Sequence, residues 1–222
     1  DDLCTRAARA LQQATGSRQG VHIAIDKRVP AEAGMGGGSS DAASCLLALN
    51  RLWDLNLDQA QLEQVGLALG ADVPFFIRGR NAWVEGIGER IQAIDLPPAR
   101  FAVVKPPEGL ATGKIFCDPE LNRSSDAAIL SGFAASPYDF GRNDLQPVAQ
   151  KLCPGVTQAI EWLGSQGLRG RMTGSGSAVF ARLPEGQLPS APPTGWRLEV
   201  CSNMEAHPLV GWAPSDMSSV GG

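Results

Sequence analysis

Apolar and polar residues alternate along the chain with two periods, and each period predicts its own kind of element. Over residues 3–14 the apolar positions recur every three or four residues, which predicts a helix ended by Gly16. Further helices are predicted at residues 42–53, at 58–70 with Asp58 as the N-cap, and near 126–133, 143–152 and 156–166. The helix at 42–53 is apolar nearly all round, so we expect it to be buried on most sides.

Alternation with a period of two predicts the strands. Val21, Ile23 and Ile25 alternate with less apolar residues and predict a strand over residues 21–27. Residues 71–77 indicate a short connection into extended chain, and residues 81–95 a hairpin that turns at 86–88. Further strands are predicted at 101–105, 178–183 and 196–200. From Glu205 onward the chain is polar and is expected to form a loose tail.

Composition narrows the class of protein. The 222 residues carry 23 acidic and 19 basic side chains, for a net charge of −4, and 43% of them are hydrophobic. That apolar content is enough for a real core, while the acidic balance argues against a nucleic-acid-binding protein. No apolar run approaches the roughly 20 residues of a membrane span, and the first residues do not resemble a secretory signal.

The cysteines and histidines do not suggest a metal site. The five cysteines lie far apart, form no Cys-x-x-Cys pair, and are accompanied by only two histidines, His22 and His207. A zinc site or a disulfide framework is therefore not expected, and we predict reduced thiols in a cytosolic protein.

A glycine-rich loop is the most informative feature of the sequence. Four of the five residues from Gly34 to Gly38 are glycine, and Ser39-Ser40-Asp41 leads directly into a predicted helix. Backbone N–H groups converge in such a loop, and the helix N-terminus adds partial positive charge, so the pattern predicts a cradle for nucleotide phosphates. An ordinary surface loop is the alternative. A Walker A loop is excluded because no lysine follows, and Ser39 stands where a Rossmann fingerprint needs its third glycine.

This loop resembles the phosphate-binding motif of the GHMP kinases, Pro-x-x-x-Gly-Leu-Gly-Ser-Ser-Ala. Here the motif reads Pro30-x-x-x-Gly34-Met35-Gly36-Gly37-Gly38-Ser39-Ser40-Asp41. Further matching stretches are Leu69–Phe76, Thr112–Leu121, Asn143-Asp144-Leu145 and Met172–Phe180. Together they resemble the branch of the family that acts on 4-diphosphocytidyl-2-C-methyl-D-erythritol, from the first residue to about Met204.

The resemblance implies an α+β protein with the two-domain GHMP kinase fold. Residues 1–98 would form an incomplete N-terminal α/β ATP-binding domain, residues 99–204 a ferredoxin-like α+β C-terminal domain, and residues 205–222 a tail. The implied activity is ATP-dependent phosphorylation of the substrate's 2-hydroxyl in non-mevalonate isoprenoid biosynthesis. ATP and Mg²⁺ are the implied cofactors, and the bacterial cytosol or a plastid stroma the implied location.

Site residues are implied by the same resemblance. Asp72 would be the catalytic base and also contact the substrate, with Thr112 and Phe116 lining the substrate pocket. Gly174, Ser175 and Gly176 would form a wall beside the transferring phosphate, and Ser39 would approach Mg²⁺. ATP would be bound by Lys27, Pro30, Ala31, Glu32, Ala33, Gly34, Met35, Gly36, Gly37, Gly38, Ser39 and Ser40.

From the residues alone, plainer roles stay open. Asp72 fits a turn after a helix, Lys27 a solvated strand end, and Phe116 a core aromatic. Residues 174–176 fit a tight turn between strands.

The sequence also departs from the family pattern. Relatives begin with a segment that supplies a catalytic lysine and a Tyr-His pair that contacts cytidine, and no counterpart is found here. We therefore expect an N-terminally truncated chain that is inactive on its own. Two other functions stay open: a different GHMP small-molecule kinase, and a nucleotide-binding relative without activity.

Overall fold

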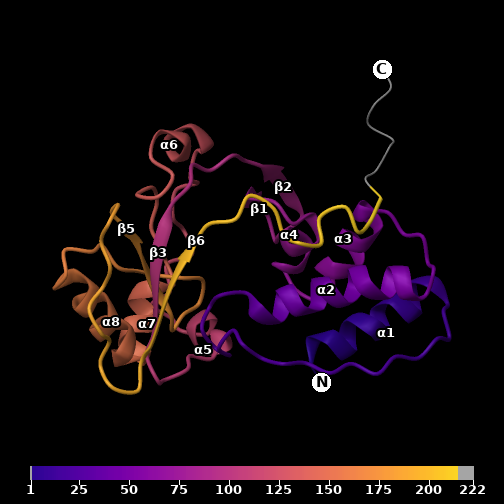
Figure 1. Cartoon of the computed structure of the whole chain (residues 1–222), viewed down its shortest axis with the longest axis horizontal. Coiled ribbons are helices and arrows are strands. Elements are labelled where there is room, and N and C mark those ends of the chain that lie inside the picture. The colour runs from indigo at the N-terminus through magenta and orange to yellow at the C-terminus, as the bar shows by residue number, and fades with distance from the viewer. Residues whose placement is uncertain (1, 215–222) are drawn as a thin grey trace. The chain divides into compact units, whose positions relative to one another are not determined.

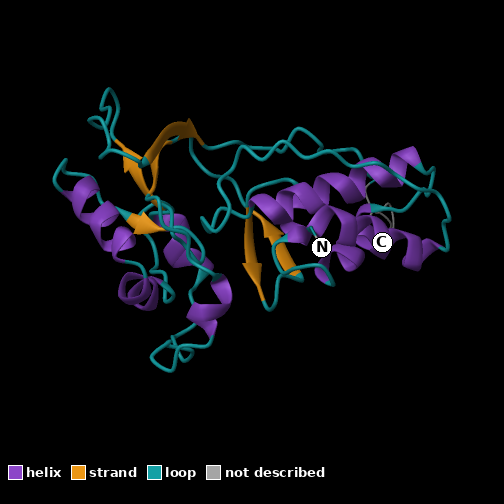
Figure 2. Ribbon diagram, turned by 90° about the horizontal axis from the view of Figure 1, so that it is seen from below, coloured by secondary structure: helices purple, strands orange, loops and turns teal. Residues whose placement is uncertain are grey.

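A computed structural model describes residues 2–214, which divide into two compact units (Figures 1 and 2). The first, the helical unit, contains residues 2–27, 36–96 and 204–214. The second, the sheet unit, contains residues 28–35 and 97–203. Helices and antiparallel strands both occur, which confirms the predicted α+β class. None of the helices in residues 2–214 combines the length and the apolar character that a membrane crossing needs.

Four helices and one hairpin form the helical unit. Its elements are α1 (Leu3–Thr15), α2 (Gly37–Leu52), α3 (Gln59–Leu67), α4 (Val73–Arg78), β1 (Ala82–Glu85) and β2 (Arg90–Ala93). Helix α2 contacts α1 on one side and α4 on another, and fully buried leucines from three helices fill the space between them: Leu11, Leu46, Leu47 and Leu62. The near-continuous apolar run of α2 thus has the buried position that was predicted.

Local signals at the helix ends explain why several predictions are confirmed. Gly16 ends α1 in the left-handed conformation with φ of 72°, and Asp58 begins α3 with a complete capping box to Gln61. The hairpin pairs Glu85 with Arg90 across residues 86–89. Each feature depends on residues close in sequence, so the pattern was sufficient to find it.

Two sequence predictions in this unit are wrong. Residues 21–27 are not a strand: they run without regular structure, Val21 and Ile25 are exposed, and no strand pairs with them in the described part of the chain. Residues 73–78 form α4 rather than extended chain, because Pro74 is tolerated in the first turn of a helix.

Residues 205–214 also differ from the expected loose tail. His207 N donates to the Gly79 carbonyl at 2.7 Å, and Arg51 lies over the Trp212 ring at 4.5 Å. Ala213 is buried in the core of the helical unit. The apolar residues Leu209, Trp212 and Ala213 of this polar segment pack against the core of the helical unit, which explains the difference. The rest of the predicted tail, residues 215–222, lies outside the described residues.

The sheet unit contains a four-stranded antiparallel sheet in the order β4-β5-β3-β6. Its elements are β3 (Arg100–Lys105), α5 (Thr112–Phe116), α6 (Leu130–Ala135), α7 (Gln146–Leu152), α8 (Pro154–Gly164), β4 (Arg171–Met172), β5 (Val179–Leu183) and β6 (Arg197–Ser202). Helix α8 packs its buried residues Val156, Ala159 and Leu163 into the core that β3 and β5 share. The strands predicted at 101–105, 178–183 and 196–200 are confirmed within two residues.

Candidate functional site

The second half of the glycine-rich loop forms the start of α2. Gly36 is the N-cap, with φ of 67° and no side-chain hydrogen bond, and the first intrahelical bond runs from Ser40 N to the Gly36 carbonyl at 2.9 Å. The N–H groups of Gly37, Gly38 and Ser39 therefore have no intrahelical acceptor. The helix begins earlier than predicted, because the glycines themselves form its first turn. An uncapped N-terminus of a 16-residue helix has the charge and the donors to hold a phosphate group.

The first half of the loop, residues 32–34, is bound to residues 173–178, which we call the second glycine-rich turn. The two segments lie about 140 residues apart in the sequence, and both belong to the sheet unit. Three hydrogen bonds connect them: from Thr173 Oγ1 to the Gly34 carbonyl (3.0 Å), from Ser177 N to the Glu32 carbonyl (3.1 Å), and from Ala178 N to the Ala33 carbonyl (3.1 Å). The conformation of residues 32–34 is therefore fixed by tertiary hydrogen bonds and is not that of an ordinary surface loop.

Glycine is required where these two segments meet. Gly34 has φ of +68°, and a Cβ there would lie 2.2 Å from the Thr173 carbonyl oxygen and 2.4 Å from the Gly176 nitrogen. A Cβ on Gly174 would lie 2.6 Å from the Gly34 carbonyl oxygen. Because every one of these obstacles is backbone, a side chain cannot be accommodated by a rotamer change.

The predicted substrate residues Thr112 and Phe116 lie on α5. Thr112 begins this helix, and its hydroxyl oxygen lies 2.7 Å from Ser175 Oγ in the second glycine-rich turn. Phe116 is 53% exposed, so it is not a core aromatic. The sheet unit thus brings together Thr112, Ser175 and the first half of the phosphate loop.

Asp72 lies in the helical unit, immediately before α4. The next two residues, Val73 and Pro74, are buried and fix the start of the helix. The Asp72 carboxylate is exposed and forms neither a hydrogen bond nor an ion pair within residues 2–214. A carboxylate whose backbone position is fixed and whose oxygens make no hydrogen bond is chemically able to accept a proton from a bound hydroxyl.

Lys27 is paired with carboxylates of the same unit. Its Nζ lies 2.6 Å from an Asp41 oxygen and 3.8 Å from an Asp2 oxygen. The hydrogen bond to Asp41 raises the pKa of Lys27 above its ordinary value. This ammonium group is therefore tied to the first turns of α2.

The sequence prediction gave no role to two residues that support the loops. Asn143 Nδ2 donates to the carbonyls of Met172 (3.0 Å) and Gly174 (2.8 Å), which fixes the second glycine-rich turn. Lys105 is 8% exposed and donates to the carbonyls of Pro106 (2.7 Å) and Glu108 (2.8 Å), and burial lowers its pKa. An ionisable residue at the end of an apolar strand was the available signal for Lys105.

Metal-binding side chains are not clustered in the part of the chain that the structure describes: no group of three or more His, Cys, Asp or Glu residues is placed to hold an ion. Ser39, the predicted Mg²⁺ contact, offers a single hydroxyl oxygen on the first turn of α2. A single hydroxyl ligand fits a magnesium ion that is held mainly by nucleotide phosphates, because Mg²⁺ commonly takes one or two protein ligands plus phosphate oxygens and water.

Comparison with known proteins gives consistent matches. The description "GHMP kinases N terminal domain" matches residues 2–80, and "GHMP kinases C terminal" matches residues 127–191. A relative from Albidiferax ferrireducens, named 4-diphosphocytidyl-2-C-methyl-D-erythritol kinase, is 62% identical over 221 residues, which are 100% of this chain and 77% of the relative. A relative of the same name from Variovorax paradoxus is 60% identical, in an alignment that covers 96% of this chain and 78% of the relative.

A solved structure is similar as well. The crystal structure of a 4-(cytidine 5'-diphospho)-2C-methyl-D-erythritol kinase aligns with a TM-score of 0.67 and 39% identity. The alignment covers 84% of this chain and 70% of that one.

Proposed function

The chain belongs to the GHMP kinase family, and on that premise we propose how its residues carry out phosphoryl transfer. The reaction is the phosphorylation by ATP of the 2-hydroxyl of 4-diphosphocytidyl-2-C-methyl-D-erythritol. The observation that carries this function is about 60% identity, over nearly the whole chain, to relatives named for that substrate.

ATP phosphates are assigned to the glycine-rich loop. The free N–H groups at the start of α2 would donate to phosphate oxygens, and the positive end of the helix would stabilise their charge. The residues from Pro30 to Met35 are proposed to contact ATP as well, and hydrogen bonds from Thr173, Ser177 and Ala178 hold residues 32–34 in place. Lys27 remains a predicted nucleotide contact that Asp41 holds near the same helix end.

Gly37→Val is expected to weaken ATP binding about tenfold or more, because loss of a charge-assisted hydrogen bond has an effect of this size. In a helix each Cβ points toward the N-terminus, so a side chain at residue 37 would project to where a phosphate binds. Calorimetric titration with ATP measures the change. The control is Gly164→Val, at the last residue of α8, where a Cβ would meet no atom within 4 Å. This variant should leave ATP affinity unaltered. Equal ATP affinity in Gly37→Val and wild type would remove the loop from the site.

Asp72 is proposed as the base. As the substrate oxygen attacks the terminal phosphorus of ATP, its proton passes to the Asp72 carboxylate, and the bond between that phosphorus and ADP breaks. Magnesium, held by the ATP phosphates and Ser39, would neutralise charge on the transferring group. The protein's own contribution is to position the hydroxyl and keep the carboxylate free to receive the proton.

Phe116 is proposed to stack on the cytosine of the substrate, with Thr112 beside it. Phe116→Leu should raise the substrate KM about tenfold, since stacking a base on an aromatic ring contributes about 1–3 kcal/mol. The KM for ATP and the melting temperature should change little, because the ring is 53% exposed. Steady-state kinetics with each substrate varied would measure this. In the control Phe101→Leu, whose ring packs against Tyr138 and Phe180, stability should fall while the substrate KM stays constant.

A substrate panel tests the function itself. ADP release is measured with 4-diphosphocytidyl-2-C-methyl-D-erythritol, homoserine and mevalonate in protein expressed from the complete gene. Release that depends on the first compound supports the proposal, whereas preference for homoserine or mevalonate would identify another GHMP kinase. ATP binding with no release on any substrate would favour a nucleotide-binding relative. A cytosolic location stays a prediction that rests on the free thiols of all five cysteines.

A further inference from the structure

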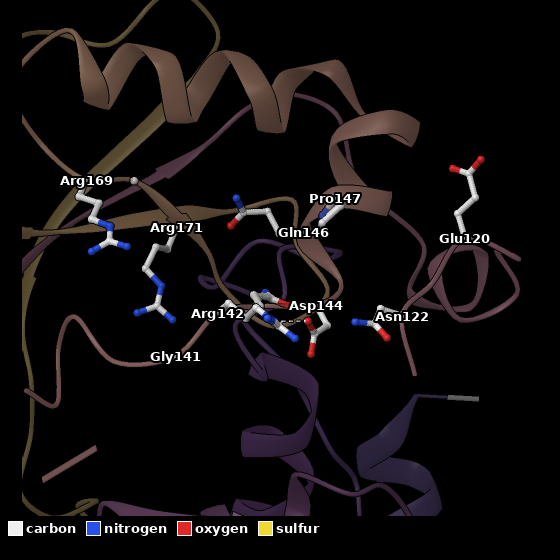
Figure 3. Close-up of a pocket in the computed structure, with 11 residues that line it drawn as sticks. Glu120, Asn122, Gly141, Arg142, Asp144, Gln146, Pro147, Arg169 and Arg171 are labelled. Carbon is white, nitrogen blue, oxygen red and sulfur yellow. Dashed lines mark hydrogen bonds and ion pairs between the residues drawn. The ribbon is translucent and has the colours of Figure 1, made fainter. Parts of the chain in front are cut away.

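The sheet unit contains a pocket whose lining includes none of the residues that were given a role in the proposed reaction. It has a volume of about 490 Å³, within the range of small-molecule sites, and lies between the loop before α7 and the edge strand β4 (Figure 3). Three arginines line it: Arg142, Arg169 and Arg171. A pocket with three guanidinium groups has the chemistry to bind an anion.

The three arginines differ in how far their charges are compensated. Arg142 is paired with Asp144, with Nε 2.8 Å from a carboxylate oxygen. Arg171 donates to the Phe140 carbonyl at 2.9 Å, and neither Arg171 nor Arg169 forms an ion pair with a carboxylate within residues 2–214. The positive charge of the pocket is therefore concentrated on Arg169 and Arg171.

These two arginines lie close together in the sequence, beside the edge strand of the sheet. Arg171 is the first residue of β4, and Arg169 lies two residues earlier, before the strand begins. Figure 3 shows both guanidinium groups directed the same way. The pKa of Arg171 is lowered by burial and then by repulsion from Arg169, while Asp139 opposes this only in part. An anion between the two groups would relieve that repulsion.

We propose that this pocket binds the diphosphate group of a small molecule through Arg169 and Arg171. Each guanidinium presents a planar fork of donors that matches one phosphate group, so two adjacent forks fit two linked phosphates. Asn143 also lines the pocket, and its amide donates to the carbonyls of Met172 and Gly174. An occupant would thus contact the residue that fixes the second glycine-rich turn.

Inorganic pyrophosphate is the probe for a direct binding test. It is titrated calorimetrically without divalent cations and with a saturating non-hydrolysable ATP analogue, so that the phosphate loop is already filled. We expect a dissociation constant below about 1 mM for wild type, and about tenfold weaker binding for Arg169→Gln and Arg171→Gln. Arg100→Gln, an exposed arginine on β3 outside the pocket, should bind like wild type.

Two results would overturn the proposal. One is the absence of pyrophosphate binding by wild type, which would leave the arginines only the role of protecting the edge of the sheet. The other is equal affinity in wild type and Arg169→Gln. Arg171→Gln loses the hydrogen bond to the Phe140 carbonyl and could therefore unfold. Arg169 is exposed and makes no hydrogen bond to the backbone of the described residues, so Arg169→Gln should stay folded and gives a decisive result on its own.

A competition titration distinguishes the two sources of the diphosphate, and this arm rests on the proposed function. If the substrate's own diphosphate occupies the pocket, substrate displaces pyrophosphate and Arg169→Gln raises the substrate KM. If a separate metabolite is the ligand, pyrophosphate binds together with substrate and the KM is unchanged in Arg169→Gln. Pyrophosphate binding is measured without turnover, so its loss is distinguishable from failure of the kinase assay.

Discussion

Asp72→Asn is expected to lower kcat by about 10²–10⁴-fold, the range for loss of a general base, while ATP and substrate still bind. Asparagine has nearly the same shape as aspartate but cannot accept the proton of the attacking hydroxyl. The exposed position before α4 and the absence of a partner for the carboxylate within residues 2–214 mean that the fold does not depend on its charge. Single-turnover kinetics in protein expressed from the complete gene would measure the chemical step directly.

Asp58→Asn is the matched control for this experiment. Asp58 is also an aspartate that precedes a helix, and asparagine is an equally good N-cap there. Its turnover should stay near wild type, with an unchanged melting temperature. If Asp72→Asn also retained turnover within a few-fold of wild type, Asp72 would not be the base.

Gly34→Ala is expected to lower the free energy of unfolding by about 3 kcal/mol, near the upper end for a single substitution. Part of this comes from forcing alanine to adopt φ of +68°, and the larger part from a Cβ placed 2.2 Å from the Thr173 carbonyl oxygen. The new atom would break the hydrogen bonds that hold residues 32–34 against residues 173–178. Urea denaturation monitored by circular dichroism gives the stability difference.

Gly16→Ala separates the two contributions. Gly16 has φ of +72°, but no atom lies within 4 Å of the position of its Cβ, so alanine there adds only the backbone strain of about 1 kcal/mol. The two variants have the same effect on the flexibility of the unfolded chain. The difference between them therefore measures the close contact at Gly34, and equal stabilities would contradict that contact.

The sequence predicts those parts of the fold that depend on nearby residues. The sequence predicted the end of a helix at Gly16, the start of another at Asp58, and the hairpin after residue 81. Each of these needs only a few consecutive residues that form a cap or a turn. Residues 21–27 have the alternation of a strand but no partner in the described part of the chain. Alternation of apolar and polar residues indicates which side chains would share a face of a strand. It does not indicate whether another strand is available to pair with it.

The sequence was enough to propose residues for the candidate site, and that assignment stays a prediction, but the contacts of these residues could not be predicted. Glycines followed by serines before an apolar helix are enough to indicate a phosphate cradle. The hydrogen bonds between residues 32–34 and the turn at 173–178 join segments about 140 positions apart. The sequence of neither segment indicates that the other is its partner. Asn143 was missed for the same reason, because its role depends on carbonyls of Met172 and Gly174.

Phosphorus NMR of the reaction products is the most direct test of the central proposal, that this protein transfers phosphate from ATP to the 2-hydroxyl of 4-diphosphocytidyl-2-C-methyl-D-erythritol. The enzyme from the complete gene is incubated with ATP and a substrate labelled with carbon-13 at carbon 2. We predict one ADP for each new phosphomonoester, whose phosphorus signal is coupled to the labelled carbon and to no carbinol proton, because carbon 2 carries no hydrogen. A phosphomonoester whose signal is split by a carbinol proton, or ADP formed with no new phosphomonoester, would contradict the account.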